Sequence, residues 1–393
     1  MEKFSKRTWM QINLDAVEHN FNAIKNKLSK GTKLLCVLKA DAYGHGAEFL
    51  VKEYEKLGAD YYGVSNIDEA IQLRKSGATK PVLIFGYTAP EMAETLCKYT
   101  ISQALFSYNY AEKLSFECRK KNLKLKVHLK IDTGMSRIGF FSQTPEDIEN
   151  STKEILKIKN FEKLEIEGIF THFSVADDIT NQKDYTLKQF KNFMTVINKL
   201  ENSSMKIPLR HCCNSAGIIN FPQMQLDMVR GGVALYGLYP SDEVKNKIDL
   251  KPIAQLKTIV SQVKTVPVGT YVSYGCTFMS SKEIKVAAVP LGYADGYSRQ
   301  FSNNAEMIVC GKRAPVIGRV CMDQLMLNVS DIDEVEEGSI VTAFGEDKGE
   351  KITVDELALK IGTINYEITC LVGKRVPRIY YKNGKVIGKA SYI

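Results

Sequence analysis

The first 240 residues alternate short apolar runs with longer amphipathic segments. Eight of the runs are rich in Val, Ile, Leu, Phe or Tyr, a composition typical of strands. These runs are Lys33–Lys39, Tyr61–Ser65, Pro81–Phe85, Ser102–Phe106, Lys126–Asp132, Ile166–Phe173, Leu209–Ser215 and Met228–Tyr236. The segments between them predict helices, such as Asp68–Lys75 and Lys188–Leu200, which carry apolar residues at helical spacing. Eight such β-α units favour a closed (β/α)8 barrel over an open, doubly wound sheet.

The pattern changes after Tyr239-Pro240. Short β-like runs divided by Gly, Pro and Asp follow, and among them only Val354–Ile361 has clear helical spacing. The runs are Ile253–Val266, Gly269–Ser273, Glu283–Pro290, Ala305–Cys310, Arg313–Val320 and Gln324–Val329. We therefore predict a barrel domain over residues 12–240 and a mostly β domain over residues 241–393, which a strand from residues 1–11 could join.

Composition narrows the class of protein. The chain has 393 residues, which is too long for one ordinary core, and 25% of them are charged. No apolar run is long enough to cross a bilayer, and no apolar signal core follows the N-terminus, so we expect a cytoplasmic protein without membrane contact. The nine cysteines show no CxxC spacing and predict reduced thiols rather than a metal site. The net charge of +8 comes from Lys and Arg interleaved with Asp and Glu, which argues against a nucleic-acid partner.

The first predicted strand ends in Lys39, and Tyr43, Gly44 and Gly46 follow at once. Burial at a strand end favours the neutral amine, which is a nucleophile that can form a Schiff base with an aldehyde cofactor. The alternative is a lysine that only extends its ammonium from a strand end to solvent.

Polar side chains also follow several later strands. His172 stands at the end of one run, the segments 130–139 and 211–216 stand at the ends of two more, and Arg230-Gly231-Gly232 interrupts the eighth run. Reactive residues of a barrel lie at the C-terminal ends of its strands, so these coincidences together predict a site. Ser215 and the Gly231–Val233 backbone come after the last two strands, where barrels often hold a phosphate. A reactive lysine combined with a phosphate site points to pyridoxal 5′-phosphate (PLP).

Over nearly its full length the chain resembles the alanine racemases, bacterial PLP enzymes with a barrel and a C-terminal β domain. Departures from the family pattern include Cys212-Cys213 and Asn13, which bear on packing. The strings that carry the resemblance are Val37–Gly46, Asp132–Arg137, Thr171–Phe173, Asn214–Ala216, Arg230–Gly237, Ser273–Gly275, Gly292–Gly296, Gly318–Gln324 and Asn365–Glu367.

The resemblance implies a role for each matching residue. Lys39 would bind PLP as a Schiff base and act as one catalytic base, and Tyr274 would be the base on the opposite face. The cofactor-binding residues would be Lys39, Tyr43, His172, Asn214, Ser215, Arg230, Gly232, Val233 and Tyr366. The substrate would meet Arg137, Met322 and Tyr293, with Lys130, His211, Cys321 and Asp323 in support. Lys130 is either carbamylated, as in some members of the family, or an ordinary lysine paired with a carboxylate.

The activity implied is interconversion of L- and D-alanine by proton transfer at Cα, which would supply D-alanine for peptidoglycan. The family also implies a homodimer in which each site takes Tyr274 and Met322 from the partner. Alternatives are a serine or broad-specificity racemase, a PLP decarboxylase of the same plan, or a non-catalytic PLP carrier. A decarboxylase is expected to place a carboxylate where Arg230 stands, and a carrier lacks the second domain. A guanidinium that stays protonated would leave the pyridine nitrogen unprotonated and discourage transamination.

Overall fold

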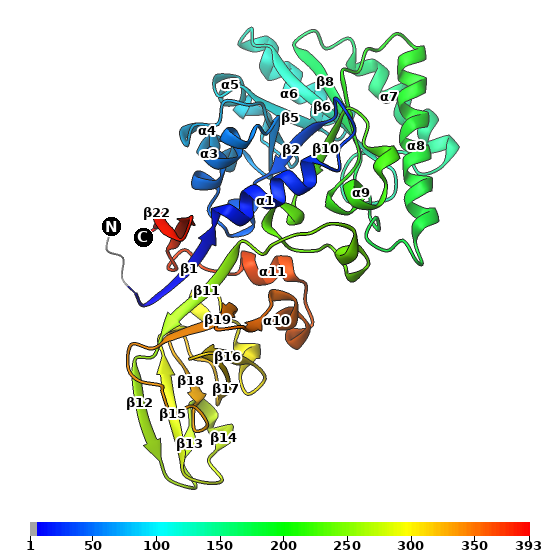
Figure 1. The fold of residues 1–393 in the computed structure, drawn as a ribbon. Helices are drawn as coiled ribbons and strands as arrows, with labels where there is room; N and C mark the ends of the chain where they lie inside the picture. Colours follow the sequence, from blue (N-terminus) through cyan, green and yellow to red (C-terminus); the bar gives the residue numbers. More distant parts are fainter. Residues whose placement is uncertain (1–5) are drawn as a thin grey trace. The chain divides into compact units, whose positions relative to one another are not determined.

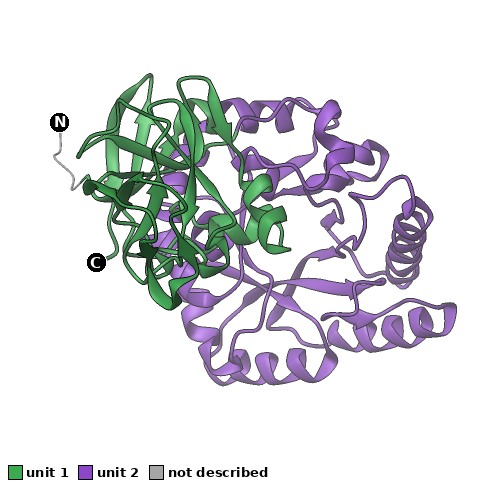
Figure 2. Cartoon of the chain, turned by 90° about the horizontal axis from the view of Figure 1, so that it is seen from below, with its two compact units in different colours: residues 1–17, 43–46, 252–393 green, residues 18–42, 47–251 purple. Residues whose placement is uncertain are grey.

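The computed structural model describes residues 6–393, and their contacts divide the chain into two compact units (Figure 2). Unit 2 comprises Glu18–Ala42 and Ala47–Lys251, and unit 1 comprises the described residues up to Val17 together with Tyr43–Gly46 and Pro252–Ile393. The predicted domain boundary after residue 240 stays a prediction.

Unit 2 is built on eight parallel strands in the order β10-β2-β3-β4-β5-β6-β8-β9. Backbone hydrogen bonds from Asp227 to Arg210 and from Arg230 to Cys213 join β10 to β9, so the sheet closes on itself. The predicted (β/α)8 barrel is confirmed. The strands are β2 (Lys33–Val37), β3 (Tyr61–Val64), β4 (Val82–Ile84), β5 (Ile101–Leu105), β6 (Leu125–Asp132), β8 (Leu164–Phe170), β9 (Leu209–His211) and β10 (Met228–Gly231), and β7 (Phe140–Phe141) pairs with β6.

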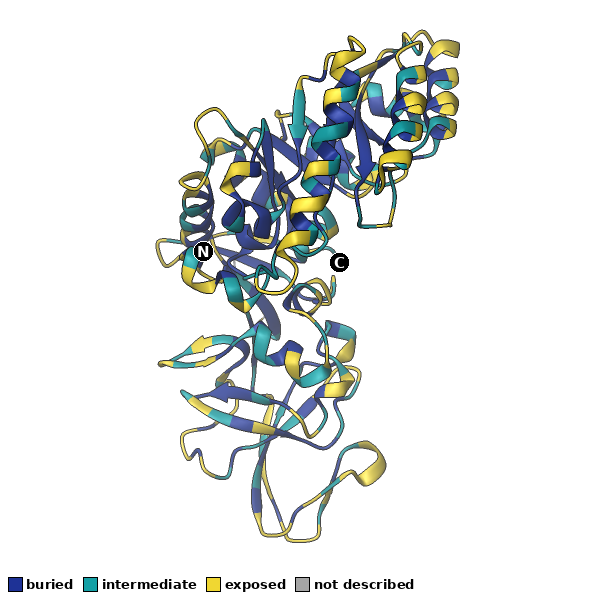
Figure 3. Cartoon of the chain, turned by 90° about the vertical axis from the view of Figure 1, so that its right-hand side faces the viewer, coloured by how far each residue is buried: buried dark blue, intermediate teal, exposed yellow. Residues whose placement is uncertain are grey.

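Helices connect the strands. The exposed residues of the helices lie mainly on the sides that face away from the strands (Figures 1 and 3). Side chains cap several of them, such as Asn66 before α4, Ser107 before α6 and Thr144 in a capping box before α7. The helices are α1 (Leu14–Lys25), α3 (Ala47–Leu57), α4 (Ile67–Lys75), α5 (Ala93–Lys98), α6 (Tyr108–Lys120), α7 (Pro145–Ile158), α8 (Lys183–Asn202) and α9 (Ser215–Asn220).

Several barrel strands end before the predicted residue, as β2 does at Val37 instead of Lys39, and the difference is largest in β9 and β10. We expected a strand through Ser215, but β9 ends at His211 and Ser215 begins α9, because the Asn214 side chain accepts a hydrogen bond from Gly217 N and caps that helix. Likewise β10 ends at Gly231, and Val233–Tyr236 form the 3₁₀ turn η3. In both cases the chain leaves the sheet where candidate site residues begin.

Unit 1 contains one large sheet in the order β12-β15-β18-β17-β16-β19-β11-β1-β21-β22, with β20 beside β19. The N-terminal strand β1 lies between β11, to which it is antiparallel, and β21, to which it is parallel (Figure 1). The strands are β1 (Thr8–Asn13), β11 (Ala254–Ile259), β12 (Gln262–Val266), β15 (Ile284–Val289), β16 (Glu306–Val309), β17 (Lys312–Ile317), β18 (Leu325–Asn328), β19 (Ile340–Asp347), β20 (Glu350–Ile352), β21 (Arg378–Lys382) and β22 (Lys385–Ala390).

A short hairpin and two helices complete unit 1. The hairpin pairs β13 (Tyr271–Val272) with β14 (Phe278–Met279), and the helices are α10 (Val354–Ile361) and α11 (Asn365–Cys370). The prediction of a mostly β second domain is confirmed. The single run expected over Ile253–Val266 was wrong in detail, because the chain breaks there into β11 and β12, which pair with different strands. No helix among residues 6–393 combines the length and apolarity needed to span a membrane.

Candidate active site

Lys39 stands at the start of a left-handed turn. Strand β2 ends at Val37, and the residues from Ala40 to Tyr43 have φ values between +52° and +55°. Such a conformation costs an L-residue roughly 1–2 kcal/mol, so surrounding contacts must hold it. Glu69 accepts a hydrogen bond from Ala40 N at 2.7 Å, and Asp41 accepts one from Ala47 N at 2.7 Å. These contacts hold the backbone that directly follows Lys39.

Ser215 lies beside the backbone of the glycine segment, as the sequence predicted it should. Its hydroxyl oxygen accepts hydrogen bonds from Gly232 N at 3.0 Å and from Ala234 N at 3.4 Å. Amide N–H groups converge here with a hydroxyl, a donor set that suits a phosphate dianion. The predicted residues Asn214 and Val233 flank the same cluster, since each adjoins one of its members in sequence.

Tyr43 and Tyr366 are neighbours within unit 1, with ring centroids 6.1 Å apart. Burial raises the pKa of the Tyr43 phenol well above its ordinary value. The phenol is therefore a neutral hydrogen-bond donor at physiological pH, which is the form that can donate to a phosphate oxygen.

Arg230 is buried at the C-terminal end of β10, with 3% of its surface exposed. Its Nη2 donates to Thr171 O and Cys212 O, both at 2.8 Å. Burial lowers the pKa of Arg230 to about 10, so the guanidinium stays charged at neutral pH. Its Nε makes none of the hydrogen bonds among the described residues, so this donor is left for a ligand.

A buried chain of hydrogen bonds leads from Arg230 to a carboxylate. Arg230 Nη1 donates to His211 Nδ1 at 2.9 Å, which places the His211 proton on Nε2. That nitrogen lies 3.0 Å from His128 Nδ1, and His128 Nε2 lies 3.2 Å from Glu167 Oε2. Because the arginine has only donors and the carboxylate only acceptors, both histidines are held neutral with their protons on Nε2. Burial, and then the charge of Arg230, lower the pKa of His211 well below its ordinary value, in agreement with this assignment.

Sequence reasoning missed His128 and Glu167. His128 could have been found, because it stands two residues before Lys130 on the same strand and alternation places both on one face. Glu167 carried no such signal. A β-bulge in β8 pairs Val127 with Ile166 but His128 with Gly168, so Glu167 is the extra residue and is turned toward the histidine.

His172 also lies against Arg230. Its Nδ1 accepts a hydrogen bond of 3.3 Å from Arg230 Nη2, so its proton is on Nε2. Burial, followed by the charges of Arg230 and Lys130, lowers the pKa of His172 well below its ordinary value. His172 is thus a neutral imidazole whose Nε2–H can donate to a ligand.

Lys130 is buried near the centre of the barrel, where no ion pair among residues 6–393 includes it. Its Nζ lies 4.7 Å from the centre of the Phe170 ring, which also stacks on His211. Burial, and then the nearby Arg230 and Arg137, lower its pKa well below the ordinary value. This direction favours the neutral form of the amine, and both expectations for Lys130 stay predictions.

The Arg137 side chain is exposed on the loop after β6, and the loop itself is tightly held. Asp132 accepts hydrogen bonds from Gly134 N at 3.1 Å and Ser136 N at 2.9 Å, and Tyr185 donates to Gly134 O at 2.8 Å. An exposed arginine on a held loop is suited to receiving a carboxylate.

The remaining predicted residues lie in unit 1, on turns whose apolar side chains face solvent. Tyr274, Met322 and Tyr293 are 71%, 53% and 43% exposed. The turns are joined by one backbone and one side-chain contact, since Tyr293 N donates to Cys321 O at 3.0 Å and the Ser273 hydroxyl lies 3.4 Å from the Cys321 sulfur. Asp323 pairs with Arg375 at 2.7 Å. These contacts bring Tyr274, Tyr293 and the 321–323 segment together in one surface of unit 1.

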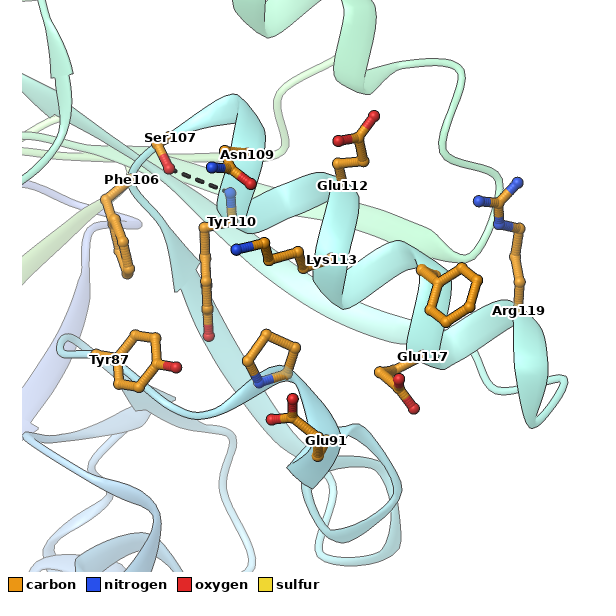
Figure 4. Close-up of a pocket in the computed structure, with 12 residues that line it drawn as sticks. Tyr87, Glu91, Phe106, Ser107, Asn109, Tyr110, Glu112, Lys113, Glu117 and Arg119 are labelled. Carbon is orange, nitrogen blue, oxygen red and sulfur yellow. Dashed lines mark hydrogen bonds between the residues drawn. The ribbon is translucent and has the colours of Figure 1, made fainter.

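A hollow of about 700 Å³ on unit 2 holds none of these residues. It lies between the segment that begins at Tyr87 and helix α6, and the rings of Tyr87, Phe106 and Tyr110 line one end of it (Figure 4). Tyr110 stacks on Phe106 with ring centroids 4.4 Å apart. The residues that line this hollow are not among the predicted site residues.

Comparison with known proteins agrees over the whole chain. The family models of the N-terminal and C-terminal domains of alanine racemase match residues 12–240 and 253–380. Alanine racemase 1 of Clostridium acetobutylicum is 45% identical over 394 residues and alanine racemase of Clostridium tetani is 42% identical over 395, each alignment covering 100% of both chains.

Solved structures are similar as well. Alanine racemase of Clostridium difficile 630 matches with a TM-score of 0.94 at 39% identity, covering 100% of both chains. The enzyme of Bartonella henselae with covalently bound pyridoxal phosphate matches with a TM-score of 0.84 at 27% identity, covering 96% of this chain and 100% of that one. The chain therefore belongs to the alanine racemase family of isomerases.

Proposed function

We propose that this chain interconverts L- and D-alanine with PLP, and that Lys39 and Tyr274 exchange the proton at Cα. The observation that carries the proposal is the environment of Arg230, a buried cation held by two backbone carbonyls and a neutral His211. An arginine here favours racemisation over decarboxylation, for which a carboxylate is expected at this position.

The residues present fit PLP. The Ser215 hydroxyl and the amides around Gly232 would supply donors for its phosphate, and the Tyr43 phenol, whose pKa is raised by burial, would supply another. Lys39 would hold the cofactor covalently, and Arg230 Nε would face the pyridine nitrogen. When bound, PLP withdraws electrons from Cα of the amino acid and so acidifies its C–H bond.

Arg230 would restrain that electron withdrawal. Its pKa of about 10 means that it stays protonated at neutral pH and accepts no proton from the ring. The neutral His211 behind it has its only proton directed to His128, so it cannot deliver one either. The chain of hydrogen bonds would therefore offer the ring nitrogen of bound PLP no proton, which would limit the electron withdrawal and discourage transamination.

Two groups would handle the Cα proton, one on each face. The Lys39 amine would serve one face and the Tyr274 phenol the other. Tyr274 must be ionised to accept a proton, and we propose that the His172 Nε2–H donates to its oxygen, because His172 Nδ1 is already engaged by Arg230. Exchange on opposite faces allows the reaction to run in both directions.

The substrate carboxylate would bind Arg137 and the backbone of Met322. The Met322 N–H makes no hydrogen bond among residues 6–393, so this donor remains for the substrate. Serine differs from alanine by one hydroxyl, and a polar pocket of this kind discriminates weakly against such an addition. A serine or broad-specificity racemase of the same fold is therefore the second candidate.

We propose that a second copy of the chain completes the site. The face of unit 1 that carries Tyr274 also exposes Tyr271 and Met279, at 58% and 53%. Exposed apolar residues gathered on one face are typical of an interface. In a two-fold dimer both sites form by the same contact, so each would take Tyr274 and Met322 from its partner.

Three narrower proposals follow from the same reading. Lys130 would carry a carbamate, because burial favours its neutral amine, which is the form that reacts with CO₂ and loses a proton. The carbamate anion would lie near Arg137. Labelling with ¹³C-bicarbonate tests this proposal. The protein would act in the cytoplasm. D-Alanine for peptidoglycan would be its product.

The test is a chiral product assay over a panel of amino acids with the purified, PLP-loaded protein. We expect exchange of both alanine enantiomers, and serine to be turned over more slowly. Preference for serine would select the second candidate, CO₂ release would indicate a decarboxylase, and bound PLP without turnover would indicate a carrier.

A further inference from the structure

Asp295 is a buried carboxylate in unit 1 to which the proposed reaction gives no role. Its side chain is 0% exposed, and it receives two parallel hydrogen bonds from the Arg7 guanidinium, both at 2.9 Å. A bidentate arginine–carboxylate pair fixes both orientation and distance. Arg7 stands 288 residues away, just before β1, so the pair ties the start of the chain to the turn at 292–296.

The same carboxylate closes the turn that presents Tyr293. Asp295 Oδ2 accepts a hydrogen bond from Gly292 N at 3.1 Å, and Asp295 N donates to Gly292 O at 3.0 Å. The turn then lies on the segment that carries Met322, because Tyr293 N donates to Cys321 O and Ala294 N donates to Met322 O. A Cβ on Gly292 would lie 2.3 Å from Met322 O, so the two segments have no room to shift independently.

A second branch reaches the other end of the Met322 segment. Arg375 Nη2 binds Asp323 at 2.7 Å, and its Nε lies 3.7 Å from Asp295 Oδ1. The backbone of Gly373 also donates to Asp295 O at 2.9 Å. Asp295 thus lies between two arginines. Arg7 directly precedes strand β1, and Arg375 binds Asp323, the residue next to Met322.

We propose that Asp295, held by Arg7, is a positioning residue that sets the spacing between Tyr293 and the Met322 backbone, and so the affinity for the substrate carboxylate. This inference rests on the substrate-binding role proposed for those two residues. Without Arg7 the buried charge would retain only Gly292 N and the more distant Arg375. The carboxylate would then turn toward solvent and the 292–296 turn would follow it.

The test compares Arg7→Met with Arg313→Met. Arg313 binds Glu306, Glu350 and Glu356 in the same unit and touches neither turn, so it is a matched loss of one paired arginine. We expect Arg7→Met to raise KM for alanine and the calorimetric Kd of propionate, a carboxylate without an amine, by between roughly tenfold and a hundredfold. PLP absorbance and kcat should change little in either variant.

Two further variants separate positioning from loss of fold. Asp295→Asn combined with Arg7→Met leaves no unpaired buried charge, so this double variant is expected to fold, which the emission of the single tryptophan, Trp9 in β1, will report. The KM of the double variant should stay raised and should match that of Asp295→Asn alone. The reason is that either substitution by itself already breaks the Arg7–Asp295 pair. Arg7→Lys, which keeps the charge but not the fork, should be intermediate.

The result that overturns the inference is an unchanged KM and propionate Kd in Arg7→Met, or their recovery in the double variant. Failure of the proposed function is a different outcome, because it would appear as absence of alanine exchange in the unmodified protein.

Discussion

The Nη1 of Arg230 donates to Nδ1 of His211 at 2.9 Å, and both side chains are buried inside the barrel. This one contact decides the protonation of the residues behind it. Arg230 has only donors, so His211 must accept and stay neutral. The pair therefore presents a permanent cation to the ligand, with no acid behind it to relay a proton.

Arg230→Glu should reverse that arrangement. A carboxylate could share a proton with the pyridine nitrogen, and the stronger electron sink should give a long-wavelength absorbance on adding alanine, with more transamination. We expect racemisation to fall by roughly a hundredfold or more. Arg230→Lys keeps the cation and is the control that should show no new band. If a folded, PLP-loaded Arg230→Glu protein shows neither the band nor transamination, Arg230 is structural only.

Lys39→Ala should remove the near-ultraviolet and visible band of the covalently held cofactor. Turnover should fall by roughly 10⁴-fold or more, since the attachment point and one base are lost together. The control is Lys33→Ala at the exposed start of β2, the strand that precedes Lys39, which should keep both the spectrum and the activity. An unaltered spectrum in Lys39→Ala would remove Lys39 from its proposed role.

Tyr274→Phe should affect the two enantiomers unequally in deuterium exchange from solvent, because only one face of the substrate loses its base. Net racemisation must still fall by one common factor in both directions, roughly 10²–10⁴-fold. Tyr87→Phe, an exposed tyrosine outside the proposed site and the proposed interface, should leave both unchanged. Undiminished exchange from both enantiomers in Tyr274→Phe would show that this phenol is not a base.

Glu167 should contribute a pH-dependent part of the stability. Burial alone would raise its pKa, but hydrogen bonds from His128, Lys126 and Ser102 lower it to about 2 from 4.5. A depressed carboxyl pKa stabilises the folded state above the unfolded-state value, and this contribution is lost as the pH falls from about 5 toward 2. At neutral pH it amounts to at most about 3 kcal/mol.

We therefore expect Glu167→Gln to lower the free energy of unfolding strongly at pH 7 and much less at pH 3.5, as measured by denaturant titration. The matched control is Glu165→Gln, two residues earlier in β8, whose exposed pair with Lys124 spans 3.5 Å and should contribute little. A deficit in Glu167→Gln that does not shrink on acidification would contradict the assigned ionisation.

Local pattern was enough to predict the barrel and most of its strand ends. Val, Ile and Leu runs mark strands that are buried on both faces, and polar residues near the strand ends, such as Lys39 and Arg230, sit where a barrel places its site. The predicted ends of β9 and β10 were wrong for a local reason. The apolar runs continue in sequence, but the Asn214 cap and the turn at Gly232 end the strands earlier.

Other features depend on contacts that no local pattern records. The bulge that turns Glu167 toward His128 is a property of the pairing between β6 and β8. The left-handed turn after Lys39 runs through non-glycine residues, against their backbone preference. The pairing of Arg7 with Asp295 joins residues 288 positions apart, so neither residue stands out in sequence.

The most direct test of the account is to mix two inactive proteins, Lys39→Ala and Tyr274→Phe, under conditions that exchange subunits. If each site takes Lys39 from one chain and Tyr274 from the partner, a mixed dimer collects both lesions in one site and leaves the other intact. Alanine racemisation should then return, up to about a quarter of the unmodified activity after random exchange, because half of the dimers are mixed and each has one good site. If subunit exchange is verified with a mass label and activity stays absent, the site is built within a single chain or does not use this pair of bases.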